Sequence, residues 1–165
     1  MFKHILMPTD GTEHSERAVQ RGIELAKLCG AKVTGIHVMQ DFRMLMADDS
    51  MVPSSVDEKM DEQAREQATR FLAFVQRAAD AAGVPCDTLI AKGQHPYDAI
   101  VDVANERGCD LIVMTARHRK GLVSLIMGSE ASRVLHRASI PVLTFRALMS
   151  ADHPDKTLPK SKYKQ

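Results

Sequence analysis

The sequence of 165 residues has no tryptophan, only two tyrosines and five phenylalanines, and no pair of cysteines at CxxC spacing. Scarce aromatic residues argue against a surface on which nucleic-acid bases stack. The three single cysteines are typical of buried thiols in a reducing compartment, not of a disulfide framework. No apolar run approaches the ~18 residues that span a membrane, and from the short strand-like run at the start we expect no secretory segment. With a formal charge of +1, the sequence predicts a cytoplasmic protein that binds neither nucleic acid nor membrane.

Motifs of catalysis are also missing from the sequence. It has neither GxxxxGK[ST] nor GxGxxG, the glycine-rich patterns that hold phosphates in two large nucleotide-binding classes. No serine stands in a GxSxG elbow, and the seven histidines never fall at metal-ligand spacing. We therefore expect no catalytic residue, no metal site and no enzymatic activity, with weak ATP hydrolysis as the open alternative.

Short apolar runs alternate with longer amphipathic ones along the chain. This alternation predicts an α/β fold with a doubly wound parallel sheet and helices on both faces. We expect one domain over residues 1–147 and a polar, lysine-containing tail without fixed structure over 148–165. The expected strands are 4–7, 33–39, 88–91, 110–115 and 140–145; the expected helices are 12–28, 56–82, one from Pro96 and one after Gly128-Ser129.

Three polar segments follow strands or open helices. Pro8-Thr9-Asp10-Gly11 ends the first strand, Thr115 ends the fourth, and Gly128-Ser129 opens the last helix. In an open α/β sheet, ligands bind beyond the carboxyl ends of the strands, where the winding reverses. If the first and fourth strands are neighbours, these segments converge on one crevice. Free amides at a helix start make such a crevice suitable for an anion.

These segments also carry a resemblance to a known family. Residues 5–15 resemble the opening of universal stress proteins, and residues 111–114, Gly121, Gly128-Ser129, 133–135 and 139–143 resemble the closing half. The likeness covers about 2–146. It implies a five-stranded sheet of order 3-2-1-4-5, similar to adenine nucleotide alpha hydrolases, and a homodimer. It also implies either ATP or AMP binding, with Mg²⁺ if ATP, or no nucleotide, depending on subclass.

The glycine motif of the ATP-binding subclass is only partly present. Its pattern places glycines at 115, 118 and 128, but this chain has Thr115 and His118. A Cβ crowds the approach of backbone amides to phosphate, and a β-branched threonine adopts positive φ poorly. Glu130, just inside the helix start, would repel phosphate. The basic run 117–120 either replaces the lost amides with side-chain cations or is a solvated loop.

The resemblance also implies contacts for individual residues. Asp10 would meet the ribose, and Pro8, Thr9 and Val38 would surround the adenine. Each has a structural alternative: Asp10 as a helix-entry turn residue, Val38 as a buried strand residue and Ser129 as an N-cap. The full candidate set is Pro8, Thr9, Asp10, Val38, Met114, Thr115, Arg117, His118, Gly128, Ser129, Glu130 and Ala131.

The last expected strand has no amphipathic helix after it and would lie at the edge of the sheet. Exposed edges are usually covered or paired, so we expect it to pair with its copy in a two-fold dimer. The alternative is coverage by the tail. The sequence thus predicts a non-enzymatic stress-response regulator acting as a homodimer with nucleotide binding weak or lost, or else an ATP/AMP switch using 117–120. The expected interface is Ile140, Val142, Leu143, Thr144 and Phe145.

Overall fold

A computed structural model describes residues 1–40, 54–116 and 129–146, and these form alternating strands and helices. The five strands pair in the order β3-β2-β1-β4-β5, and every described pairing is parallel. This confirms the predicted doubly wound sheet. The predicted tail, 148–165, lies outside the described residues. The elements are β1 (His4–Pro8), α1 (Glu13–Cys29), β2 (Lys32–Gln40), α2 (Ser54–Ala82), β3 (Cys86–Gly93), α3 (Pro96–Glu106), β4 (Leu111–Ala116), α4 (Ser129–Arg137) and β5 (Val142–Arg146).

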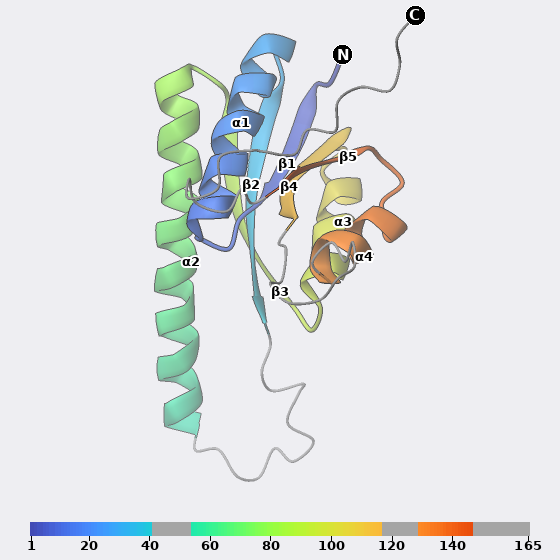
Figure 1. Ribbon diagram of the computed structural model, residues 1–165. Coiled ribbons are helices and arrows are strands. Elements are labelled where there is room, and N and C mark those ends of the chain that lie inside the picture. Colours follow the sequence, from blue (N-terminus) through green and yellow to red (C-terminus); the bar gives the residue numbers. More distant parts are fainter. Residues whose placement is uncertain (41–53, 117–128, 147–165) are drawn as a thin grey trace, which may run out of the picture.

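The helices cover both faces of the sheet, with α1 and α2 on one side and α3 and α4 on the other (Figure 1). Each face has its own apolar core, because successive strand residues point to opposite sides. Ile5 and Met7 of β1 pack with α1 and α2, whereas Leu6 between them packs with α3 and α4. The central strands are therefore apolar on both faces, as the continuous run 111–114 predicts.

Local signals place the helix ends. The Thr12 side chain caps α1 by accepting from the amide of Ser15, and Gly30 ends the helix in the left-handed region at φ 65°. A threonine N-cap and a left-handed glycine are common at helix ends, and both ends of α1 lie within one residue of the predicted helix 12–28. The last strand is shorter than predicted, because Ile140 and Pro141 precede β5. The Pro141 carbonyl still accepts from the amide of Ile112 at 3.0 Å, which holds this segment beside β4.

Candidate functional site

The predicted site residues at the ends of β1, β2 and β4 lie at one edge of the sheet. β1 pairs with β2 through Pro8 and Ile36 and with β4 through Leu6 and Ile112. Parallel pairing in this register brings the carboxyl ends of the three strands together, at the place where the winding reverses. Arg117, His118 and Gly128 lie outside the described residues, and Ser129 is the first residue of α4.

The turn after β1 is held by hydrogen bonds within a few residues. The exposed Asp10 accepts at Oδ1 from the Thr12 amide at 3.0 Å and from the Thr12 hydroxyl at 2.6 Å. Thr9 is buried; its Oγ1 lies 3.1 Å from Oγ of Ser15 and accepts from the amide of Gly11 at 3.2 Å. Asp10 is therefore a turn residue at the start of a helix, which is the structural alternative predicted for it. A contact with ribose remains a prediction.

The side chains of β4 divide between the two faces of the sheet. Met114 is buried on the α3 and α4 side, and Val38 of β2 is partly buried against the same core. Thr115 faces the other way, because its hydroxyl donates to the His14 carbonyl of α1 at 3.1 Å. Its position in β4 is paired with Phe145 of β5. Among the described residues only glycines have positive φ. Thr115 is thus an ordinary strand residue without positive φ, and the poor tolerance of a β-branched side chain for that conformation has no effect at this position.

Glu130 and Ala131 lie in the first turn of α4. Ala131 is buried against the α3 and α4 core. Oε2 of Glu130 accepts from the amide of Tyr97 at 3.1 Å, and Oε1 lies 4.0 Å from an Arg133 guanidinium nitrogen. The N-cap residue of α3 makes no side-chain hydrogen bond, so Glu130 supplies the acceptor that α3 lacks. No spacing or motif in the sequence predicts this hydrogen bond between α3 and α4.

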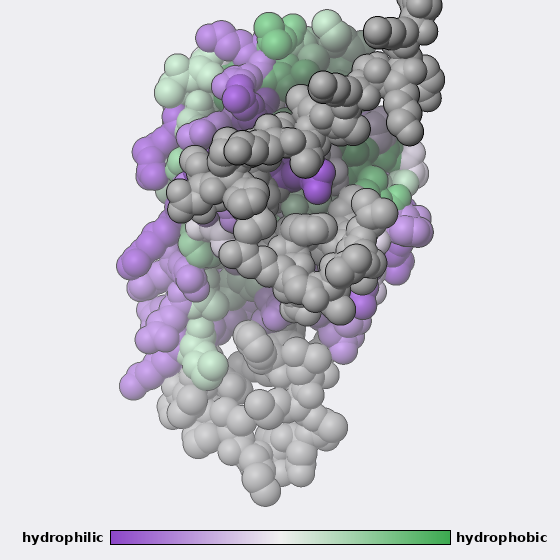
Figure 2. All heavy atoms as spheres, in the orientation of Figure 1, coloured by the Kyte–Doolittle hydropathy of each residue, from purple (hydrophilic) through white to green (hydrophobic). Residues whose placement is uncertain are grey.

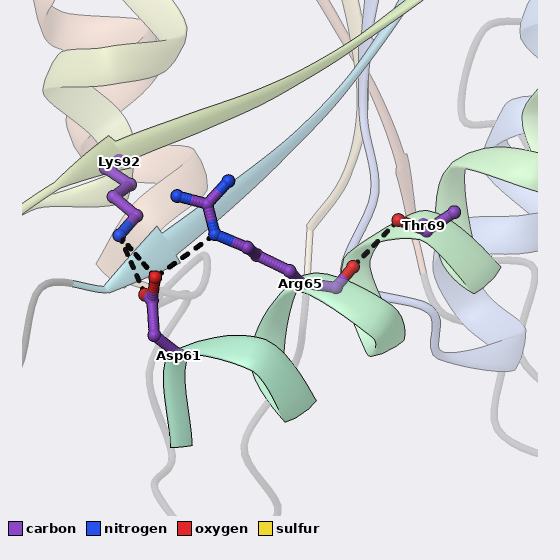
Figure 3. Close-up of polar contacts among 4 residues, drawn as sticks. All are labelled: Asp61, Arg65, Thr69 and Lys92. Atoms are coloured by element: carbon purple, nitrogen blue, oxygen red, sulfur yellow. Dashed lines mark hydrogen bonds and ion pairs between the residues drawn. The ribbon is translucent and has the colours of Figure 1, made fainter. Parts of the chain in front are cut away.

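A second polar network lies where α2 passes the end of β3 (Figure 3). Asp61 accepts from Nζ of Lys92 at 2.7 and 2.9 Å and from Nε of Arg65 at 3.1 Å. The hydrogen bond from Lys92, followed by that from Arg65, lowers the pKa of the Asp61 carboxyl. The side chains of this network are partly exposed, and the outer side of the molecule along α2 is largely hydrophilic (Figure 2). The Asp61 and Arg65 pair follows the i,i+4 pattern of the helix, but Lys92 has no sequence signal.

The β5 edge pairs with β4 and with no other strand that the structure describes. Leu143 is 38% exposed there. Phe145 packs partly against the α1 and α2 core, and Ile140 and Val142 pack partly against the α3 and α4 core. Thr144 is half-buried. The predicted interface residues are thus neither buried in one protomer nor fully solvated, but a second protomer stays a prediction.

The fold and the site define a class: an open, doubly wound α/β domain with polar turns at its switch point. The model of the universal stress protein family matches residues 1–146. The chain is 33% identical over 148 residues to universal stress protein MJ0531 of Methanocaldococcus jannaschii, covering 88% of this chain and 83% of that relative. The chain therefore belongs to the universal stress protein family.

Solved structures agree with this assignment. The structure of MJ0577, a universal stress protein of Methanocaldococcus jannaschii, matches with a TM-score of 0.74 and 25% identity, covering 91% of this chain and 99% of that one. A universal stress protein in complex with cAMP matches with a TM-score of 0.65 and 23% identity, over 87% of this chain and 97% of that one. At that identity the second match shows the fold alone. In the part of the chain that the structure describes, none of the helices has the length and apolarity of a membrane span.

Proposed function

We propose that the chain is a non-enzymatic regulatory protein of the cytoplasm, made of one domain over 1–147, that acts as a homodimer and binds adenine nucleotide weakly or not at all. The observation that carries the proposal is that the polar groups at the switch point already make hydrogen bonds within the protein. Asp10 is bonded to Thr12, and Thr9 to Ser15. Glu130 is bonded to Tyr97. A ligand must exchange these bonds for its own, so each contact yields little net free energy.

The glycine positions of the motif support the same proposal. His118 stands where the ATP-binding subclass has its second glycine, and a Cβ there crowds the approach of backbone amides to phosphate. The carboxylate of Glu130 also places a negative charge in the first turn of α4, near the amides that would meet phosphate. Both features lower the expected affinity for ATP more than for a ligand with a single phosphate.

A nucleotide switch is the second candidate, and the orientation of Thr115 favours it. Its hydroxyl donates to a carbonyl of α1. The threonine that stands in place of the motif's first glycine therefore does not place its side chain on the α3 and α4 face of the sheet. A relative of the same fold was solved with cAMP. In this proposal the basic run 117–120, outside the described residues, supplies side-chain cations in place of the missing amides.

Calorimetric titration with ATP, AMP and cAMP, with and without Mg²⁺, separates the two candidates. We expect no micromolar binding by the unchanged protein, and tighter ATP binding after His118→Gly, which removes the Cβ that crowds the phosphate. Micromolar binding that Asp10→Ala weakens, and that the matched exposed-surface variant Asp102→Ala does not, would establish the switch instead. Release of phosphate above the buffer blank, lost in Asp10→Ala, would contradict the non-enzymatic proposal.

The homodimer is tested at Leu143, on the β5 edge. We expect the unchanged protein to have the mass of a dimer by light scattering, and Leu143→Lys to have the mass of a monomer, because a charge desolvated in an interface is costly. Leu28→Lys is the matched control, since Leu28 is 80% exposed at the end of α1. A Leu143→Lys protein that remains dimeric excludes β5 as the interface.

A further inference from the structure

The turn that carries Asp10 rests on two aromatic side chains from other elements. Nδ1 of His37, on β2, lies 2.8 Å from the carbonyl oxygen of Thr9. A carbonyl only accepts, so Nδ1 carries the hydrogen and donates it. Phe71 of α2 packs edge-on against the His37 ring, with centroids 5.2 Å apart and planes at 68°. Both rings therefore lie behind the turn, on the α2 side of the sheet.

Phe71 also touches the turn directly at Gly11. Gly11 has φ +70°, and a Cβ built on it would lie 2.0 Å from two ring carbons of Phe71. The ring thus occupies the space that any side chain at position 11 would need. One helical turn further along α2, Val75 makes a similar approach: a Cβ on Gly35 of β2 would lie 2.9 Å from it. Phe71 and Val75 are therefore set against His37 and Gly35, so α2 is held in a fixed register along β2.

We propose that His37 and Phe71 are positioning residues that set the orientation of Asp10 for ligand binding. The Thr9 carbonyl and the Asp10 amide belong to one rigid peptide plane. The hydrogen bond from His37 fixes one side of that plane, and the Thr9 amide, which donates to the Ile36 carbonyl at 2.9 Å, fixes the preceding peptide. Phe71 then limits the path of the chain at Gly11. The ligand part of this inference rests on the proposed function, in which any bound nucleotide meets Asp10.

Substitutions at position 37 distinguish a positioning role from simple core packing. The two roles predict different orders of the variants in amide exchange at the turn and in nucleotide affinity. The side-chain nitrogen of asparagine lies close to where Nδ1 of histidine stands, whereas that of glutamine lies one carbon further out. His37→Asn therefore keeps a donor for the Thr9 carbonyl. His37→Gln displaces the donor, and His37→Leu removes it while filling similar volume. Packing alone predicts the opposite ranking, because leucine and glutamine fill the site better than asparagine does.

Amide hydrogen exchange and nucleotide titration of the full chain are both monitored by ¹⁵N NMR. This method measures dissociation constants in the millimolar range. The Gly11 and Thr12 amides report on the turn, because they donate to Thr9 and Asp10. We expect faster exchange of these two amides in His37→Leu, His37→Gln and Phe71→Leu, and near-normal exchange in His37→Asn. The dissociation constant for AMP should rise about tenfold in the first three variants. This is the factor expected when the ligand loses one hydrogen bond to a displaced Asp10.

Thermal unfolding is recorded for each variant, so that loss of the turn is separated from loss of the fold. Unchanged exchange at Gly11 and Thr12 in His37→Leu would overturn the inference, as would equal effects of asparagine and leucine. If the unchanged protein binds neither AMP nor ATP at millimolar concentration, the ligand part of this inference and the nucleotide-switch candidate both fail, whereas the proposed function, which allows no binding, stands. The exchange rates of the ligand-free variants still decide whether His37 and Phe71 position the turn.

Discussion

At the amino end of the sheet, polar side chains bind partners far away in the sequence, whereas Thr9 and Asp10 at the carboxyl end bind neighbours within six positions. Asp110 accepts from the amides of Lys3 at 2.8 Å and His4 at 3.0 Å, more than a hundred residues earlier. The His4 ring bridges Thr34 and the Arg107 carbonyl. The bonds that Asp10 accepts from Thr12 instead close the turn between β1 and α1.

This difference separates bonds that secure the fold from the bonds of one turn, between β1 and α1, that can open locally. Bonds between distant elements are lost only when strands separate, so they add to global stability. Bonds within a turn open without disturbing the sheet, at a free energy below that of global unfolding. Binding sites are usually found on such turns, held by a rigid scaffold. The carboxyl end fits that description, provided that His37 and Phe71 support its turn.

The largest effect should come from Gly11→Ala at the carboxyl end. The new Cβ meets the Phe71 ring, and the backbone has positive φ. We expect a loss of roughly 2–4 kcal/mol in the free energy of unfolding, from overpacking and left-handed strain together. Gly30→Ala is the control, because Gly30 has φ +65° with no atom within 4 Å of a built Cβ. It should cost about 1 kcal/mol by urea denaturation. Equal losses would mean that Phe71 does not press on the turn.

Asp110→Ala should have the next largest effect, at the amino end. The variant leaves the amides of Lys3 and His4 without their acceptor, which should cost about 1–2 kcal/mol in the free energy of unfolding. Asp102→Ala, an exposed position of α3, should stay within about 0.5 kcal/mol of the unchanged protein. A loss at Asp110 no larger than at Asp102 would remove the distinction between the two ends.

The sequence predicts the elements of this fold better than the contacts between them. The alternation of apolar runs predicted the parallel sheet, and the family resemblance implied its strand order. The predicted helix 12–28 lies within one residue of α1 at each end. Periodicity tells which face a residue lies on but not what it meets there. The bonds from Lys92 to Asp61 and from Tyr97 to Glu130 join different elements. They depend on helix register, which a single sequence does not record.

The third and smallest effect concerns pH at the amino end. His4 is buried, its Nδ1 lies 3.1 Å from the Arg107 carbonyl and its Nε2 lies 2.8 Å from the Thr34 hydroxyl. Nδ1 therefore donates to the carbonyl, and in the neutral ring Nε2 accepts from the Thr34 hydroxyl. Burial, followed by the charge of Lys32, lowers the pKa of His4 from its ordinary 6.5, against the weaker opposing effects of the Arg107 carbonyl, Asp110 and Asp87.

Because the folded protein holds His4 neutral, the unfolded chain binds more protons on this residue in mild acid. Stability is then fully present above pH 6.5 and falls as the pH drops through that value, levelling off below the folded pKa. Urea midpoints across this window should therefore decline toward acid, and His4→Gln should flatten the decline. His136→Gln, at an exposed position of α4, should keep the slope of the unchanged protein. If His4→Gln keeps that slope too, protonation of His4 does not weaken the amino end in this pH window.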